Sequence, residues 1–118
     1  MKIAIDDTRT LMFCDIVFRT PYSLLDYSKT DLWQKVKEIY FDHDLGIGVL
    51  TGLQVMAMLY DDNKFPANIK IITANLEGRK NMIAFLVNDC GYVKDGMDMK
   101  YTCNISKEQF TVTTMVRK

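Results

Sequence analysis

Short apolar runs, each closed by polar residues, recur along most of the chain. They predict strands at residues 2–5, 14–18, 38–41, 68–72 and 92–93. These runs show little alternation, which is typical of strands that are buried on both faces of a parallel sheet. Segments with apolar residues at helical spacing separate most of them. The pattern therefore predicts an α/β chain with a mostly parallel sheet and helices on both of its faces.

The predicted helices begin at recognisable capping signals. Threonine and asparagine cap the first turn of a helix well, and proline is favoured at the first helical position. A threonine followed three residues later by glutamine forms a capping box. The signals are Thr20 before Pro21, Thr51 with Gln54, and Asn75 ahead of apolar positions 82, 83, 85 and 86. After Asp6-Asp7-Thr8-Arg9, only residues 10–13 remain before the second predicted strand, so no full helix is expected there.

The segment after Asp95 carries conflicting signals. Ser106 with Gln109 forms another capping-box pattern, which favours a final helix. Residues 110–116 are rich in threonine and valine, which favours a strand instead. Of these two alternatives we predict the helix. The choice also decides which surface a possible homodimer would use.

Composition and charge place the chain among globular proteins. Its 118 residues fit a single domain, 1–118, and a hydrophobic content of 48% suffices for a packed core. The net charge of zero argues against a protein that grips a nucleic-acid backbone over many phosphates, although a site for one phosphate is compatible with it. No DNA-binding module, signal peptide or membrane-length apolar run is visible, so we expect a cytoplasmic protein without a membrane partner.

The cysteines predict no metal site or disulfide framework. Cys14, Cys90 and Cys103 are odd in number and form no C-x-x-C motif. We interpret them as buried, reduced thiols in a reducing compartment.

Acidic and small polar residues follow three of the predicted strands. Asp6 and Asp7 follow the first strand, Asp42 with Asp44 follows the third, and Thr73 follows the fourth. Ligands of open parallel sheets bind beyond the carboxyl ends of the strands, where strand order reverses. If the first strand lies between the second and third, these residues converge there. Clustered carboxylates repel one another unless a cation neutralises them. Mg²⁺ binds carboxylates and can keep a coordination position for a phosphate oxygen.

Each candidate residue also has a simpler interpretation. Asp6, Asp7 and Asp42 are predicted metal ligands, or else solvated strand-end carboxylates. Asp44 either binds the metal or caps the following glycine loop, and Arg9 pairs with a phosphate or with a surface carboxylate. Thr73 either donates a hydrogen bond to a phosphate or is an ordinary strand residue.

Two further candidates carry similar alternatives. His43 is the single histidine, and its usual pKa range suits acid–base catalysis, but it could instead fix the loop. Strand alternation would point His43 away from Asp42. Asn75 is predicted first as a helix cap, and a ligand contact is compatible with that role.

Three motifs together resemble the cyclic-phosphate processing receiver-like domain, a variant of the receiver domain of two-component signalling. They are Asp6-Asp7-Thr8-Arg9, Asp42-His43-Asp44-Leu45-Gly46 and Thr73-Ala74-Asn75. The five-residue segment is the most specific, and the resemblance spans about residues 2–91. By analogy with signalling receivers, Lys94 would be the lysine that contacts the phosphate. The chain departs from the family at Ile72-Thr73, where His-Ser is common.

The resemblance implies a fold and an activity. The implied fold is a receiver-like (flavodoxin-like) three-layer sandwich, with about five parallel strands and the first receiver helix shortened or missing. The implied activity is binding and hydrolysis of a cyclic phosphate, such as a 2′,3′-cyclic phosphate on RNA or a nucleotide, with Mg²⁺ or Mn²⁺. Asp42 and His43 would be catalytic, and Arg9, Thr73, Asn75 and Lys94 would bind phosphate. RNA repair and nucleotide metabolism are the implied settings.

Two other functions remain open at this point. The chain could be a signalling receiver that is phosphorylated on Asp42. It could also be a non-catalytic interaction protein with a relict site, for example a subunit that acts through a protein partner.

Overall fold

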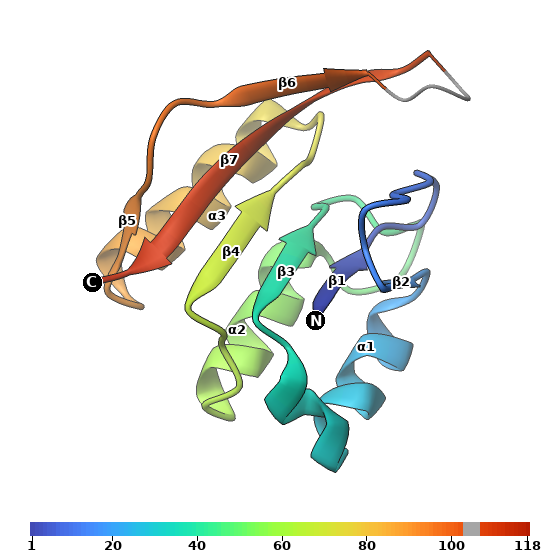
Figure 1. Cartoon of the computed structure of the whole chain (residues 1–118), viewed down its shortest axis with the longest axis vertical. Helices are drawn as coiled ribbons and strands as arrows, with labels where there is room; N and C mark the ends of the chain where they lie inside the picture. The colour runs from blue at the N-terminus through green and yellow to red at the C-terminus, as the bar shows by residue number, and fades with distance from the viewer. Residues whose placement is uncertain (103–106) are drawn as a thin grey trace.

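The computed structural model describes residues 1–102 and 107–118. Within these ranges seven strands form a sheet with the order β2-β1-β3-β4-β7-β5, and β6 pairs with β7 outside this path (Figure 1). The strands are β1 (Lys2–Ile5), β2 (Ile16–Phe18), β3 (Glu38–Phe41), β4 (Asn68–Ile71), β5 (Tyr92–Lys94), β6 (Met99–Thr102) and β7 (Gln109–Arg117). The helices are α1 (Pro21–Ser28), the 3₁₀ helix η1 (Asp31–Lys35), α2 (Gly52–Asp61) and α3 (Leu76–Asn88). The receiver-like α/β class is confirmed.

The N-terminal half of the sheet is parallel. Strands β2, β1, β3 and β4 all run in the same direction, with β1 between β2 and β3. This is the arrangement in which the polar strand ends converge. No helix lies between β1 and β2 among residues 6–15, so the first receiver helix is missing, as predicted.

The predicted helix caps are present. The Thr20 hydroxyl accepts a hydrogen bond from the Ser23 amide, and Pro21 occupies the first turn of α1. Thr51 and Gln54 form a complete capping box at α2. Asn75 accepts from the Gly78 amide at the start of α3. These caps satisfy backbone donors that the first helical turn leaves without partners.

The helices lie on one face of the sheet rather than on both. The larger core cluster joins Leu24 of α1, Met56 of α2 and Met82 of α3 to the same side of β1, β3 and β4. The other face carries a smaller cluster that includes Leu11 and Phe110, without a helical residue. The described chain therefore has one helical layer where a three-layer sandwich was expected. The reason is that the first receiver helix is absent and the C-terminal segment is extended.

The C-terminal segment forms a strand, so our prediction of a final helix was wrong. Residues 109–117 are β7, and Ser106 of the proposed capping box lies outside the described residues. Strand β7 pairs antiparallel with β4 on one edge and with β5 on the other. These two ladders satisfy the backbone of the β-branched segment on both sides, which a local capping signal does not outweigh. Strand β5 runs in the direction of the parallel strands, but β7 separates it from β4.

Strand β7 extends past the carboxyl end of β4. Residues 113–116 pair with β4, whereas residues 109–112 pair with β6. The β6–β7 hairpin therefore rises above the sheet edge at which β1, β3 and β4 end (Figure 1). This extension brings C-terminal residues to the same edge as the acidic strand ends.

The remaining sequence expectations concern the cysteines and the membrane. Cys14 and Cys90 are free and partly buried, and Cys103 lies outside the described residues. Burial raises the pKa of Cys14 to about 12 and that of Cys90 to about 11, which keeps both thiols protonated and unreactive. None of the described helices has the length and apolar character that a membrane span requires.

Candidate metal and phosphate site

Three carboxylates meet beyond the adjacent ends of β1 and β3. Ile5 and Phe41 are register partners in these parallel strands, so the residues that follow them are neighbours. One oxygen from each of Asp6, Asp7 and Asp42 lies within 4.8 Å of the other two. The sequence prediction that these side chains converge is confirmed. We call Asp6, Asp7 and Asp42 the acidic cluster.

Asp6 organises the loop that follows β1. Its carboxylate is fully buried and accepts hydrogen bonds from the amides of Thr8 at 3.0 Å and Arg9 at 2.9 Å. The Arg19 guanidinium donates to the carbonyls of Asp6, at 3.1 Å, and Arg9, at 2.5 Å. Asp7 is only partly buried and has no hydrogen bond or ion pair within the described ranges. Among the three carboxylates, Asp7 is thus the one that makes no contact which stabilises the described fold.

The surroundings of Asp42 disfavour the negatively charged form of its side chain. Its side chain is buried, and burial, followed by repulsion from Asp6, raises its pKa to about 6. Arg9, a hydrogen bond with the Thr73 hydroxyl and the His43 amide at 2.8 Å partly oppose this shift. A divalent cation among these oxygens would remove the repulsion, so the donor set fits a hard cation such as Mg²⁺.

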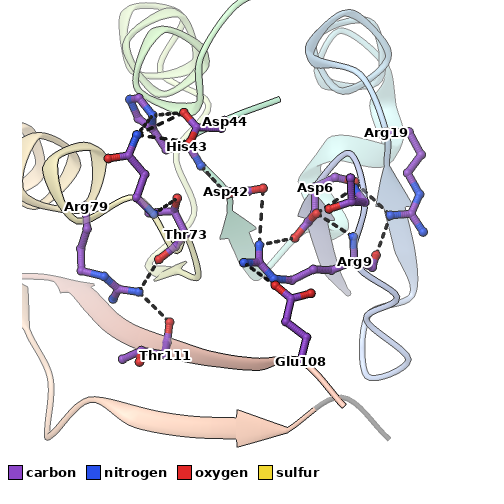
Figure 2. Close-up of polar contacts among 12 residues, drawn as sticks. Asp6, Arg9, Arg19, Asp42, His43, Asp44, Thr73, Arg79, Glu108 and Thr111 are labelled. Carbon is purple, nitrogen blue, oxygen red and sulfur yellow. Dashed lines mark hydrogen bonds and ion pairs between the residues drawn. The ribbon is translucent and has the colours of Figure 1, made fainter. Parts of the chain in front are cut away.

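Arg9 is the cation that contacts the cluster in this structure. Its Nη1 atom lies 3.1 Å from Asp6 Oδ2 and 3.5 Å from Asp42 Oδ2, and its Nη2 atom lies 3.3 Å from Glu108 Oε1. The guanidinium also lies over the Phe110 ring, 5.7 Å from its centroid. Figure 2 shows the side chain between the two strand ends and β7. Burial lowers the pKa of Arg9, but its carboxylate partners outweigh burial and raise it overall.

Sequence reasoning missed the contribution of β7. Glu108 and Phe110 reach Arg9 only because β7 is inserted beside β4 and extends beyond it. A predicted C-terminal helix gave no reason to place either residue near Asp42. The threonine and valine content of residues 110–116, which favours a strand, was the signal that could have suggested this contact.

His43, Asp44 and Asn75 form a second polar group beside the acidic cluster. His43 Nδ1 lies 2.9 Å from Asp44 Oδ1, and Asn75 Nδ2 donates to both Asp44 carboxylate oxygens at 3.2 Å. The imidazole packs against Gly78 in the first turn of α3. His43 therefore points away from Asp42, as strand alternation indicated (Figure 2). The hydrogen bond with His43 also lowers the pKa of the exposed Asp44.

Thr73 connects the two groups. Its hydroxyl accepts a hydrogen bond from the Asn75 amide at 3.1 Å and lies near the Asp42 carboxylate, where it helps to lower the pKa of Asp42. Its carbonyl accepts from Arg79 at 2.8 Å. Because Thr73 is buried, its hydroxyl is held in place next to the cluster.

Lys94 lies apart from the other predicted site residues. It is on β5, which β7 separates from β4, and its Nζ atom pairs with Asp98 at 3.0 Å. The insertion of β7 therefore removes the lysine from the position that an adjacent fifth strand would have given it.

Gly78→Ala should destabilise the protein although alanine normally favours a helix. A Cβ at this position would lie 2.7 Å from His43 Nδ1, so the ring must move and its contact with Asp44 must break. We expect a loss of about 1 to 2 kcal/mol in the free energy of unfolding, measured by urea denaturation. In a His43→Ala background the same change should be neutral or stabilising, by up to about 1 kcal/mol. An equal loss in both backgrounds would contradict the proposed packing of His43 on Gly78.

Comparisons with known proteins identify the family. The family model described as the cyclic-phosphate processing receiver domain matches residues 1–88, which include every site residue named above except Lys94, Glu108 and Phe110. Searches of curated proteins and of solved structures found no match. The match covers most of the chain and contains the acidic cluster with its supporting loops. The chain belongs to the cyclic-phosphate processing receiver family.

Proposed function

We propose that this chain binds a divalent cation, Mg²⁺ or Mn²⁺, and uses it to bind and hydrolyse a cyclic phosphate such as a 2′,3′-cyclic phosphate. The observation that carries the proposal is the meeting of Asp6, Asp7 and Asp42 within 4.8 Å, with Asp6 and Asp42 buried and Asp7 partly buried. Like charges this close are costly without a cation, and among the described residues Arg9 is the one side chain that forms ion pairs with the cluster, with Asp6 and Asp42.

The three carboxylates would hold the cation. A divalent cation supplies Lewis-acid polarisation of phosphate oxygens when it is bound. Asp6 is fixed by two backbone amides and Asp42 by the His43 amide and Thr73, so both carboxylates are positioned before any ligand arrives. Such positioning lowers the cost of assembling a site.

Arg9 and Thr73 are the groups best placed to contact a phosphate. The Arg9 side chain borders the cluster, and its buried Nε atom has no hydrogen-bond partner among the described residues. An unused buried donor next to an anion site supports a role in phosphate binding. The Thr73 hydroxyl lies on the opposite side of Asp42, next to the first turn of α3.

Ring opening requires few groups. One water adds to phosphorus, one phosphorus–oxygen bond of the ring breaks, and the released ribose oxygen takes a proton, which leaves a phosphate monoester. We assign no step to His43, because its ring contacts Asp44 and α3 instead of the cluster. Its proposed role is to position Asp44 and Asn75, and the catalytic role predicted from sequence remains to be tested.

Asp7→Asn is the sharpest test of the proposed function. The wild-type protein with Mg²⁺ should open an RNA end that carries a 2′,3′-cyclic phosphate, and the variant should lose about 100-fold or more in kcat/KM. Stability should be preserved, because Asp7 makes no hydrogen bond or ion pair in the described fold. The conversion of cyclic to linear ends is measured by electrophoresis or phosphorus NMR.

Two comparisons make the result interpretable. Asp26→Asn removes the same charge from the exposed side of α1 and should leave turnover unchanged. His43→Gln should cost less than about tenfold if His43 only positions its neighbours, and far more if it transfers a proton. Absence of both turnover and Mg²⁺-dependent binding of cyclic phosphates in the wild-type protein would refute the proposal.

A further inference from the structure

A cavity of about 550 Å³ lies beyond the carboxyl end of β4. Its walls come from the first turn of α3 and from the part of the β6–β7 hairpin that extends past β4. We call it the β7 pocket, and its lining includes Thr73, Leu76, Arg79, Lys100, Gln109 and Phe110. Pockets of about 300 to 1,000 Å³ are typical of small-molecule sites. The β7 pocket is therefore large enough for a nucleoside.

The β7 pocket borders the acidic cluster. Thr73 borders both, since it lines the pocket while its hydroxyl neighbours the Asp42 carboxylate. Asp42 follows β3, Thr73 follows β4, and Thr111 lies on β7, so two strand spacings, about 10 Å, separate Asp42 from the far wall. A single nucleotide can extend over this distance. A ligand with its phosphate at the cluster would thus place the adjoining group in the pocket.

The lining combines apolar surface with hydrogen-bonding groups. Leu76 is the first residue of α3, and it lines the pocket with 73% of its surface exposed. Phe110 lies on the opposite side, where its ring is buried between other residues, with Arg9 over it and Tyr101 stacked against it. Gln109 and Thr111 also line the pocket and add polar groups to it. Apolar walls with polar edges match a planar heteroaromatic base.

The charge of the β7 pocket favours an anionic ligand. Arg79 forms its base, held by Thr113 Oγ1 and by the carbonyls of Thr73 and Thr111. Asp98, which also lines the pocket, is already paired with Lys94 at 3.0 Å. Lys100 is exposed at the pocket and has no ion-pair partner in the part of the chain that the structure describes. Among the described residues Arg79 and Lys100 form no ion pair, and Asp98, which also attracts Arg79, is the one carboxylate in the lining.

From this arrangement we infer that the β7 pocket binds the terminal nucleoside of the substrate, with Lys100 contacting the phosphate on its 5′ side. The inference rests on the proposed function, and it specifies the substrate class as a nucleotide chain end that carries a cyclic phosphate. Sugar phosphates without a base would leave the apolar walls and Lys100 unused. The pocket walls on β6 and β7 lie outside the region matched by the family model.

Three ligands test the inference in the presence of Mg²⁺. They are a methyl riboside cyclic phosphate without a base, adenosine 2′,3′-cyclic phosphate, and a dinucleotide that ends in the same cyclic phosphate. We expect kcat/KM, or the association constant where the ring is not opened, to rise about tenfold or more from the first to the second. A further rise of about threefold to the third should weaken with added salt.

Two variants separate the contributions of the pocket. Leu76→Ala shortens an exposed wall without disturbing the core and should reduce the advantage of adenosine over the base-free ligand to within about threefold. Lys100→Gln should remove only the advantage of the dinucleotide. Lys29→Gln, at the exposed end of α1, is the matched control and should change neither ratio.

The outcomes distinguish this inference from the proposed function. Equal handling of the base-free and adenosine ligands by the wild-type protein would overturn the pocket assignment and leave the cyclic-phosphate activity intact. Adenosine-dependent binding that Leu76→Ala weakens, without ring opening, would support the pocket and refute hydrolysis. If the wild-type protein binds none of the three ligands, both are refuted.

Discussion

Replacing Gly52 by alanine is expected to destabilise the protein by about 2 to 3 kcal/mol and to abolish cation binding. Gly52 is the first residue of α2, and its amide donates to the His43 carbonyl at 2.7 Å. A Cβ there would overlap the carbonyl oxygen of Asp42 and lie 2.9 Å from the carbonyl carbon and 3.0 Å from His43 Cα. These are backbone atoms that no rotamer change can move, so the segment that carries Asp42 must shift.

The expected loss of stability in Gly52→Ala is informative because it is opposite to the usual effect of this substitution in a helix. A helical Gly→Ala substitution ordinarily stabilises a protein by about 0.5 to 1 kcal/mol. Gly48→Ala is a suitable control, because Gly48 has a positive φ of 74° but no atom within 4 Å of the added Cβ. It should cost only about 1 kcal/mol through backbone strain and should preserve cation binding. Urea denaturation and calorimetry with Mg²⁺ measure the two effects, and a stable Gly52→Ala protein would contradict the close approach of α2 to Asp42.

Replacing Asp42 by asparagine should stabilise the cation-free protein at pH 7.5 and remove its stabilisation by Mg²⁺. The raised pKa of about 6 means that the folded state binds the Asp42 proton more tightly than the unfolded chain, where the pKa is near its ordinary value of 3.8. The stabilising contribution of the proton is fully present below about pH 4 and is lost as the pH rises through about 6. Asparagine has no charge to bury, so we expect a gain of about 1 to 2 kcal/mol in EDTA.

When Mg²⁺ is added, the wild-type protein should become more stable than the Asp42→Asn variant. At about 100 times its dissociation constant, a bound cation stabilises the wild-type protein by about 2.7 kcal/mol, and the variant should gain almost none of this. The advantage of the variant in EDTA should also shrink between about pH 7 and pH 5, because wild-type Asp42 then becomes protonated. Thermal unfolding at several pH values, with and without Mg²⁺, provides the measurement.

Asp44→Asn is the matched control for Asp42→Asn. Asp44 is two residues away, but its pKa is lowered by the hydrogen bond with His43 and its side chain is 68% exposed. The variant should therefore be slightly less stable at neutral pH and should keep the Mg²⁺ effect. Loss of the Mg²⁺ effect would instead support the sequence prediction that Asp44 is a metal ligand.

The acidic cluster could be predicted from sequence because its geometry follows from local rules. Asp6 and Asp42 each come directly after a short apolar strand, and parallel strands end at one edge of the sheet. Thr51 and Asn75 fixed the helix starts through capping, which depends on residues three positions apart. The direction of His43 also followed from strand alternation.

The contribution of the C-terminal segment could not be predicted in the same way. The position of β7 depends on pairing with β4, about 40 residues earlier in the chain, and no local signal encodes such a partner. The capping pattern at Ser106 was therefore given too much weight. As a result, the contacts of Glu108 and Phe110 with Arg9 were missed, and Lys94 was assigned to a site from which β7 separates it.

The placement of β7 between β4 and β5 has a consequence for synthesis on the ribosome. Residues 92–94 are translated before residues 109–117, yet β7 is the strand with which they pair. The four parallel strands can assemble first, while β4 keeps an unpaired edge until the later strand arrives. An exposed edge of this kind invites pairing with a neighbouring chain. Nascent chains that pause within this interval should therefore be the ones most prone to aggregate and most dependent on chaperones.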